Sequence, residues 1–269
     1  MKLAYFNDFT LGIVKDDSVV DVSGVVRDIP HLGPHDLING LIERWEQYRE
    51  RLQKAADSSE GIPLGLVRLR APLPRPGKML CMARNFIESP NEEAQPLNAF
   101  LKSPNTVSDP GSTVVIPSAQ ATIFEHEAEL AVVIGKRASH LSQAEALDYI
   151  FGYTQFMDVS ARGLPGGFFL GKSWHTFAPM GPALVTADEV STPNDLSVKL
   201  WVNDVLKHDF STGDMARHIP ELLEEITKVI TLEPGDVVAT GTHHQALSPI
   251  EDGFKVRLGV EGFGPPLEV

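Results

Sequence analysis

The sequence is poor in cysteine and contains no long apolar run. Cys81 is its single cysteine in 269 residues, so no intrachain disulfide can form. A lone thiol is typical of a reducing compartment. No apolar stretch approaches the ~20 residues that a membrane-spanning helix needs, and Met1–Thr10 lacks the apolar core of a secretory leader. These absences predict a cytoplasmic protein.

Positive charge is also scarce. The chain has 23 Lys and Arg against 36 Asp and Glu, which gives a formal net charge of −13. Binding to DNA or RNA needs a basic face, and docking on anionic lipid needs one as well. We therefore expect no nucleic acid and no membrane partner, and look instead for a small-molecule ligand.

The distribution of turns and apolar segments predicts an α+β fold that is mostly β. The 22 glycines and 20 prolines are spread along the chain, which favours many short elements over a helix bundle. The proline-punctuated run at 71–77 marks the best boundary. It divides the chain into a small N-terminal β/α domain, 1–72, and a larger domain, 73–269. Strands are expected in the larger domain at 79–82, 113–116, 128–134, 199–202, 237–240 and 255–260.

Apolar residues at three- and four-residue steps predict three helices. The first begins with Asp36 as N-cap and continues to Leu52. The second begins at Ser142, which forms a capping box with Glu145, and runs towards residue 150. The third begins near residue 219 and carries one apolar face.

A literal P-loop pattern, G-x-x-x-x-G-K-S, occurs at 166–173. Phosphate binding by this motif needs a strand before the loop and a helix after it. Prolines lie shortly before and after the match, and bulky apolar residues fill the part that should wrap phosphate. We therefore interpret the match as accidental.

An acidic series at 125–129 is the most informative segment. Glu125, Glu127 and Glu129 alternate, so in a strand they would share one face at about 6.5–7 Å spacing. Like charges in this arrangement repel unless a cation neutralises them, and carboxylate oxygens suit Mg²⁺. The alternative interpretation is a solvated strand face beside a buried apolar run.

Further charged residues follow an aromatic segment at 151–157. Asp158 could be a helix N-cap or a third metal ligand. Arg162 and Lys172 could clamp an anionic substrate, although single cations of this kind are usually surface charges.

Taken together, these segments resemble the fumarylacetoacetate hydrolase superfamily, and the motifs follow one another across about 75–269. The matching segments are Glu127-x-Glu129-Leu130-Ala131-Val132-Val133-Ile134-Gly135, Gly152-Tyr153-Thr154, Asp158-Val159-Ser160-Ala161-Arg162, Leu170-Gly171-Lys172-Ser173, Pro179-Met180-Gly181-Pro182 and Leu232-Glu233-Pro234-Gly235-Asp236-Val237-Val238-Ala239-Thr240-Gly241-Thr242.

The resemblance implies a mixed β-sandwich roll, usually dimeric, with one Mg²⁺ or Mn²⁺ in each subunit. Members act on small 2-oxo and 1,3-diketo acids, often in aromatic catabolism, because the two oxygens of a 2-oxo carboxylate chelate the metal and the enolate is stabilised. The metal ligands implied are Glu127, Glu129 and Asp158, and the substrate-binding residues are Lys172, Thr242 and Arg162, with Lys172 also catalytic.

The chain departs from the family at the lid. Hydrolases and decarboxylases of the family carry Asn-Tyr-x-x-His-x-x-Glu there, and the matching stretch begins at Asn85. Glu92 is retained as a catalytic candidate, but Ser89 stands in the histidine position. Pro90 also disfavours a helix through that point. Serine cannot act as a base at neutral pH without a base of its own.

Two histidines beside Thr242 could supply the missing base, because histidine titrates near neutral pH. We take His243 as the catalytic candidate, with His244 as its neighbour. The alternative is that both merely close a loop.

The sequence thus predicts a divalent-metal-dependent hydrolase that cleaves a C–C bond in a small 2-oxo or 1,3-diketo acid. Isomerisation or decarboxylation is the alternative, since isomerisation needs no activated water and tolerates the replacement by Ser89. A third alternative is a binding protein that has kept the metal site and lost catalysis.

Overall fold

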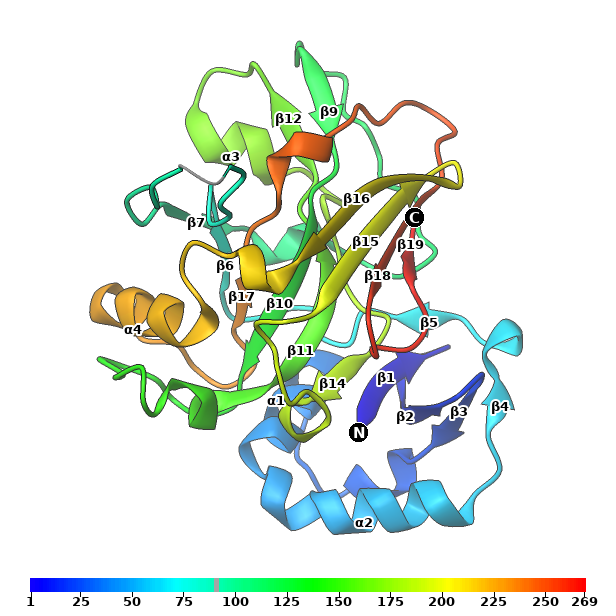
Figure 1. The fold of residues 1–269 in the computed structure, drawn as a ribbon. Coiled ribbons are helices and arrows are strands. Elements are labelled where there is room, and N and C mark those ends of the chain that lie inside the picture. Colours follow the sequence, from blue (N-terminus) through cyan, green and yellow to red (C-terminus); the bar gives the residue numbers. More distant parts are fainter. Residues whose placement is uncertain (90–91) are drawn as a thin grey trace.

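The computed structural model describes residues 1–89 and 92–269, and strands dominate it (Figure 1). Most of them belong to an 11-stranded sheet in the order β4-β3-β2-β1-β14-β11-β10-β17-β6-β7, with β5 paired to β1. The prediction of a mostly β, α+β fold is confirmed. Within the described residues, no helix combines the length and the apolar character needed to cross a bilayer.

The N-terminal part contributes an antiparallel meander and two helices. Strand β1 pairs with β14 as well as with β2, so this part continues the main sheet. Its elements are β1 (Lys2–Phe6), β2 (Thr10–Lys15), β3 (Ser18–Asp21), α1 (Pro34–Glu43), α2 (Trp45–Ser58), β4 (Ile62–Pro63) and β5 (Leu69–Arg70).

The prediction of a single helix from Asp36 to Leu52 is wrong in two respects. Helix α1 starts earlier, at Pro34, and the Asp36 carboxylate accepts a hydrogen bond from the Leu32 amide (3.1 Å) outside the helix. Arg44 then leaves helical geometry (φ −109°, ψ 18°) and separates α1 from α2. This turn allows Trp45 to pack edge-on against an aromatic ring of β11.

The central strands are buried on both faces. In β10, Leu130, Val132 and Ile134 face one hydrophobic core, while Ala131 and Val133 face the other. A strand between two cores is apolar at nearly every position, which explains the run from Leu130 to Ile134, and Glu129 is the one polar residue of β10. The central strands are β6 (Met79–Met82), β10 (Ala128–Ile134), β11 (Ile150–Met157), β14 (Leu184–Thr186) and β17 (Val237–Ala239). Strand β7 (Ala99–Lys102) forms an edge of the sheet, and exposed and buried residues alternate along it.

A second, four-stranded sheet in the order β16-β15-β18-β19 shares one of these cores with the main sheet and with helix α4. Because β17 pairs parallel to β6 while its other neighbour, β10, is antiparallel, the main sheet is mixed. The expected mixed sandwich is confirmed. The elements are β15 (Ser197–Val202), β16 (Val205–Ser211), α4 (Ile219–Val229), β18 (Val256–Val260) and β19 (Leu267–Glu268).

Two expected elements are not formed. Residues 113–116 make no strand, because the Val115 amide donates to the Thr176 hydroxyl rather than to a neighbouring strand. The helix expected from Ser142 is reduced to a 3₁₀ turn, Ala146–Tyr149. The Ser142 hydroxyl donates to the Glu145 carboxylate (2.6 Å) instead of capping backbone amides, and β11 begins immediately afterwards.

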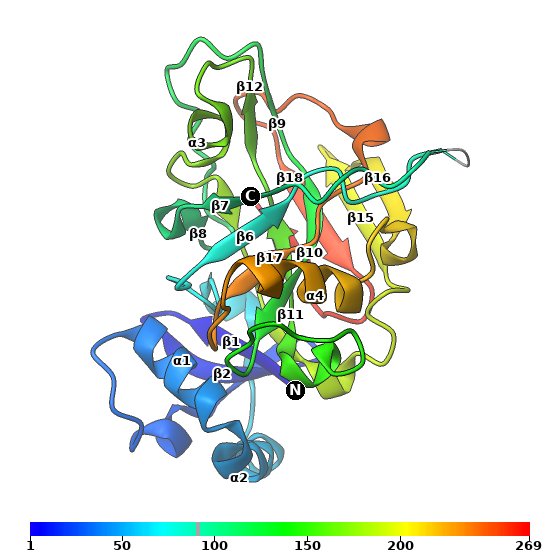
Figure 2. The same cartoon turned by 90° about the vertical axis from the view of Figure 1, so that its left-hand side faces the viewer.

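Helices α1 and α2 lie at one end of the molecule, and α3 (Gly167–Lys172) with the strand pair β9 (Ile123–Glu125) and β12 (Ser160–Arg162) lies at the other (Figures 1 and 2). A short parallel pair, β8 (Val107–Ser108) and β13 (Ala178–Pro179), completes the strands. Because β10 and β11 are antiparallel, the start of β10 lies beside the end of β11, close to β9 and β12.

Candidate metal centre and active site

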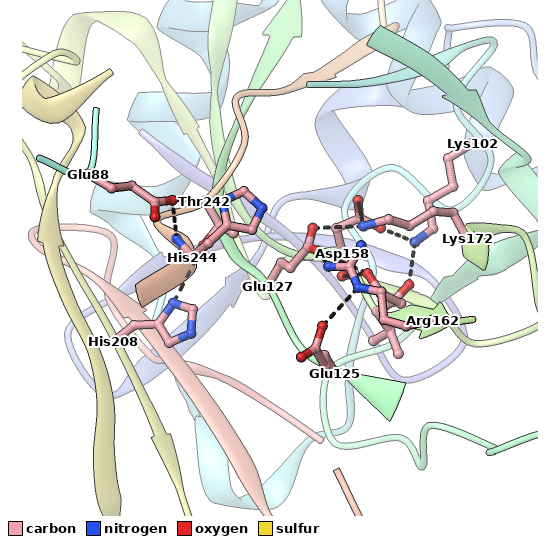
Figure 3. Close-up of polar contacts among 12 residues, drawn as sticks. Glu88, Lys102, Glu125, Glu127, Asp158, Arg162, Lys172, His208, Thr242 and His244 are labelled. Carbon is pink, nitrogen blue, oxygen red and sulfur yellow. Dashed lines mark hydrogen bonds and ion pairs between the residues drawn. The ribbon is translucent and has the colours of Figure 1, made fainter. Parts of the chain in front are cut away.

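Three carboxylates meet where β10 begins and β11 ends. Ala128 is paired with Met157, so Glu127 and Glu129 at the start of β10 lie next to Asp158, which follows β11. One oxygen from each lies within 4.8 Å of the others, and all three side chains are buried. Figure 3 shows Glu127 and Asp158 directed towards the same point.

Glu125 does not extend this cluster, although the alternating pattern placed it on the same face. The chain leaves strand geometry at His126 and Glu127, so Glu125 ends a separate strand, β9. That strand pairs with β12, where Arg162 Nε donates to Glu125 (2.8 Å). Asp158 provides the third carboxylate instead.

Three cations surround the carboxylates (Figure 3). Lys172 Nζ donates to Glu127 (2.7 Å) and to Asp158 (2.8 Å). Arg162 bridges Glu125 and Glu127. Lys102, at the end of β7, is fully buried and bonds to Asp158. Lys102 was not predicted as a site residue from the sequence. The only sequence feature that pointed to it is its position at the end of a short strand-like segment.

The ion pairs determine the protonation of Glu127 and Lys172. Burial opposes the charge of Glu127, but Lys172 and Arg162 outweigh it and lower the pKa of this carboxyl to about 2. Burial likewise opposes the charge of Lys172, yet Asp158 and Glu127 raise its pKa. Both groups are therefore ionised at neutral pH.

Glu129 has no such neutralising contact. Burial raises the pKa of its carboxyl well above the ordinary value, and the charges of Asp158 and Glu127 raise it further. Oε2 accepts a hydrogen bond from the Gly241 amide (2.9 Å), whereas Oε1 is buried and has no partner among the described residues. Buried polar atoms without partners are rare. Three converging carboxylates with an unsatisfied oxygen fit a hard divalent cation.

A cavity of about 160 Å³ opens beside the carboxylates. It brings together one metal-ligand candidate and all three predicted substrate-binding residues. The residues that line it include Glu127, Arg162, Lys172, Thr242 and His244, together with Phe100 and Phe168. A buried cation site with fixed positive charges beside a small cavity can hold a compact anionic ligand.

The other two catalytic candidates lie elsewhere. Glu92 is exposed and accepts a hydrogen bond from the Glu88 amide (2.8 Å). The ring of His243 stacks near Phe210 (centroids 6.1 Å apart). Neither Glu92 nor His243 lines the cavity in the described part of the chain. Pro90, expected to interrupt a lid helix, lies outside the described residues.

The P-loop pattern has a different structural role. Lys172 ends α3, whereas the phosphate-binding motif needs its lysine at the start of a helix. The short helix α3 directs the lysine amine onto Glu127 and Asp158.

The chain matches known proteins over most of its length. Residues 78–266 match the family model for the fumarylacetoacetate (FAA) hydrolase C-terminal domain. The structure of maleylpyruvate hydrolase from Sphingobium sp. SYK-6, in complex with manganese(II) and pyruvate, superposes with a TM-score of 0.91. That likeness covers 100% of this chain and 98% of the other, at 33% sequence identity.

Two further relatives are named for activities other than hydrolysis. Oxaloacetate tautomerase of Bacillus subtilis (strain 168) is 36% identical over 258 residues, covering 88% of this chain and 86% of that protein. The structure of 2-hydroxyhepta-2,4-diene-1,7-dioate isomerase from Mycobacterium marinum is 36% identical with a TM-score of 0.69, over 78% of this chain and 80% of the other. The motif resemblance is confirmed: the chain belongs to the fumarylacetoacetate hydrolase family.

Proposed function

We propose that this protein is a divalent-metal-dependent enzyme that hydrolyses a C–C bond in a small 2-oxo or 1,3-diketo acid. The observation that carries the proposal is the buried cluster of Glu127, Glu129 and Asp158, with one oxygen of Glu129 unsatisfied, beside a cavity lined by cations. Likeness to maleylpyruvate hydrolase along the whole chain supports hydrolysis as the reaction.

The three carboxylates would hold Mg²⁺ or Mn²⁺, both of which take oxygen ligands. Such an ion polarises the 2-oxo carbonyl of a chelated substrate and stabilises the negative charge of the enolate. Lys172 and Arg162 would orient the substrate carboxylate, and Thr242, which also lines the cavity, would contribute a hydroxyl hydrogen bond.

The charge balance around the site favours an anionic substrate. The three candidate metal ligands and Glu125, together with the cations bonded to them, carry four negative and three positive formal charges, so the formal net charge of this group is 3 − 4, or −1. A divalent cation changes this to +1, which attracts a carboxylate ligand. The groups counted are Glu125, Glu127, Glu129 and Asp158 against Lys102, Arg162 and Lys172.

A second candidate reaction is keto–enol tautomerisation or isomerisation of a 2-oxo acid. Ser89 in place of the lid histidine favours it, because this reaction needs enolate stabilisation and proton transfer but no attack by water. Likeness to the Bacillus oxaloacetate tautomerase supports it too. Decarboxylation of a 2-oxo acid would use the same enolate stabilisation.

Product analysis tests these alternatives. The purified protein is incubated with Mg²⁺ or Mn²⁺ and oxaloacetate, acylpyruvates, fumarylpyruvate or 2-hydroxy-diene-dioates. We expect cleavage of an acylpyruvate to pyruvate and a carboxylic acid, which Glu127→Ala abolishes and the exposed-site control Glu261→Ala does not. Isomerised products without cleavage would replace the hydrolase proposal with the second candidate. Tight 2-oxo acid binding without any product would indicate a non-catalytic binding protein.

We further infer from the family resemblance a homodimer that works in the cytoplasm, in aromatic catabolism. Light scattering on the purified protein tests the dimer directly, because a monomer mass would contradict it.

A further inference from the structure

Glu88 and His244 join two segments beside the cavity, which His244 lines. Glu88 follows β6 and His244 follows β17, and these strands are parallel neighbours whose ends lie together. Glu88 Oε1 accepts a hydrogen bond from the backbone amide of His244 (2.7 Å) and lies 2.8 Å from its Nδ1. The Glu88 carbonyl also accepts a hydrogen bond from the Gln245 side chain. The pair is therefore built into the fold by several contacts.

This contact fixes how His244 presents its ring. An ionised carboxylate can only accept, so Nδ1 carries the hydrogen, and Nε2 of the neutral ring is left as an acceptor. His244 lines the cavity with Glu127 and Lys172, and in Figure 3 its ring lies between Glu88 and Glu127. Its side chain is 33% exposed, so water can reach it.

The other histidines near the site do not share these features. His126 and His208 are each only 1% exposed, and His243 packs near Phe210. Among the described residues that line the cavity, His244 is the one histidine, and it has a carboxylate partner. Its position is separate in sequence from Ser89, where the family's lid histidine would stand.

We propose that His244, oriented by Glu88, is the general base that moves protons for this site, in place of a lid histidine. The proposal rests on the proposed function and names the residue that performs its proton transfers. His244 is the catalytic residue and Glu88 a positioning residue, an arrangement in which a carboxylate fixes the tautomer of the base.

In hydrolysis, His244 Nε2 takes a proton from water while the water oxygen bonds to the acyl carbonyl carbon of the substrate. The tetrahedral adduct then collapses, the C–C bond breaks, and its electron pair passes to C3 of the 2-oxo acid. The His244 imidazolium returns the proton to C3. One water is consumed, and a carboxylic acid and a 2-oxo acid are formed. Without cleavage, the same nitrogen removes and returns a C3 proton, which exchanges with solvent.

Exchange of the pyruvate methyl protons in D₂O with Mg²⁺, followed by proton NMR, tests the pair separately from cleavage. We expect His244→Ala to slow both exchange and acylpyruvate cleavage by about 100-fold or more, and Glu88→Gln by about 10-fold. Affinity for Mg²⁺ and pyruvate, measured by calorimetry, should stay within about threefold of the wild-type value.

Added imidazole should partly restore exchange in His244→Ala but not in Glu127→Ala. His140→Ala, at an exposed histidine, is the matched control.

The outcomes separate this proposal from the proposed function. Normal cleavage and exchange in His244→Ala, or a loss confined to His243→Ala, overturns the role of His244 and leaves the hydrolase intact. Exchange that depends on His244 in a protein that cleaves nothing supports the pair and rejects hydrolysis. A wild-type protein that neither exchanges nor cleaves overturns both.

Discussion

At the residue scale, Glu129 is held in an environment that opposes its charge. Its carboxyl is buried beside two other carboxylates, which raise its pKa, and one oxygen has no partner within the described residues. A carboxyl whose pKa is higher in the folded than in the unfolded state opposes folding once the pH exceeds its unfolded value. Glu129→Gln keeps the shape and removes this charge. We therefore expect the metal-free variant to be at least as stable as the wild type at pH 7. Each ~1 kcal/mol gained in the free energy of unfolding should raise the melting temperature by about 2–4 °C.

The same substitution should remove the stabilisation by metal. Thermal unfolding with and without Mg²⁺ or Mn²⁺ measures both effects in one experiment. The wild type should gain melting temperature with metal, and Glu129→Gln should gain little. A variant that is less stable without metal and still responds to it would show that Glu129 has a structural role only.

Two buried histidines make the free energy of unfolding depend on pH in the acidic range. His126 and His208 lie with ring centroids 5.3 Å apart, and burial lowers the pKa of His126 to about 4 and that of His208 to about 3. Between pH 6.5 and 4 the unfolded chain binds protons that the folded chain does not, so stability falls as the pH falls. At ~1.4 kcal/mol per pKa unit, His126 alone should cost roughly 3 kcal/mol over this range.

Urea unfolding at several pH values between 7.5 and 4 measures this loss. His208→Gln should flatten the dependence, because it removes one of the two groups that must stay neutral. An equal slope in the variant and the wild type would assign the acid sensitivity to other groups.

The sequence revealed the carboxylates of the site better than their partners. Glu127, Glu129 and Asp158 belong to local motifs, so spacing and resemblance both pointed to them. Lys102 and Glu88 reach the site only because β7 pairs with β6 and β6 with β17, which are contacts between distant segments. A residue whose role is created by tertiary pairing leaves no periodic signal in its own neighbourhood.

At the element scale, α3 determines where Lys172 lies. Phe168 of this short helix stacks on Phe100 of β7 (centroids 4.2 Å apart), and the Lys172 amine lies over the same ring. We expect Phe168→Ala to loosen α3 and raise KM about 3–10-fold, as an aromatic pair contributes ~0.5–1.5 kcal/mol, while metal affinity stays the same. Steady-state kinetics with Phe169→Ala as control test this, since Phe169 is 73% exposed. Equal KM values for the two variants would contradict it.

The elements whose bounds were predicted correctly are those that a single local sequence pattern determines. Strand β10 was predicted with its observed bounds, 128–134, because a strand buried on both faces has a nearly continuous apolar sequence, here interrupted only by Glu129. The break at Arg44 was missed because the apolar periodicity continues across it, and only the packing of Trp45 on Phe151 reveals it. Residues 113–116 have strand-like composition, but a strand also needs a neighbour, and composition does not show one.

At the scale of the whole molecule, the N-terminal part and the rest share a hydrophobic core. Leu3, Leu11 and Leu41 pack in one cluster with Val133 and Leu184 of the central strands. The pairing of β1 with β14 adds a continuous hydrogen-bonded connection. The boundary at residue 72 stays a prediction, and a shared core makes it unfavourable for either part to unfold alone.

Unfolding should accordingly be one cooperative transition. Leu41 is fully buried in the shared core, so Leu41→Ala should cost about 2–5 kcal/mol and lower a single melting temperature by ~2–4 °C per kcal/mol. Leu66→Ala, at a residue 77% exposed, should change little. Calorimetry with tryptophan fluorescence measures this, because Trp45 lies in α2 and Trp201 in the second sheet. An early transition confined to the N-terminal part in Leu41→Ala, with metal binding retained, would show that the two parts are stable independently.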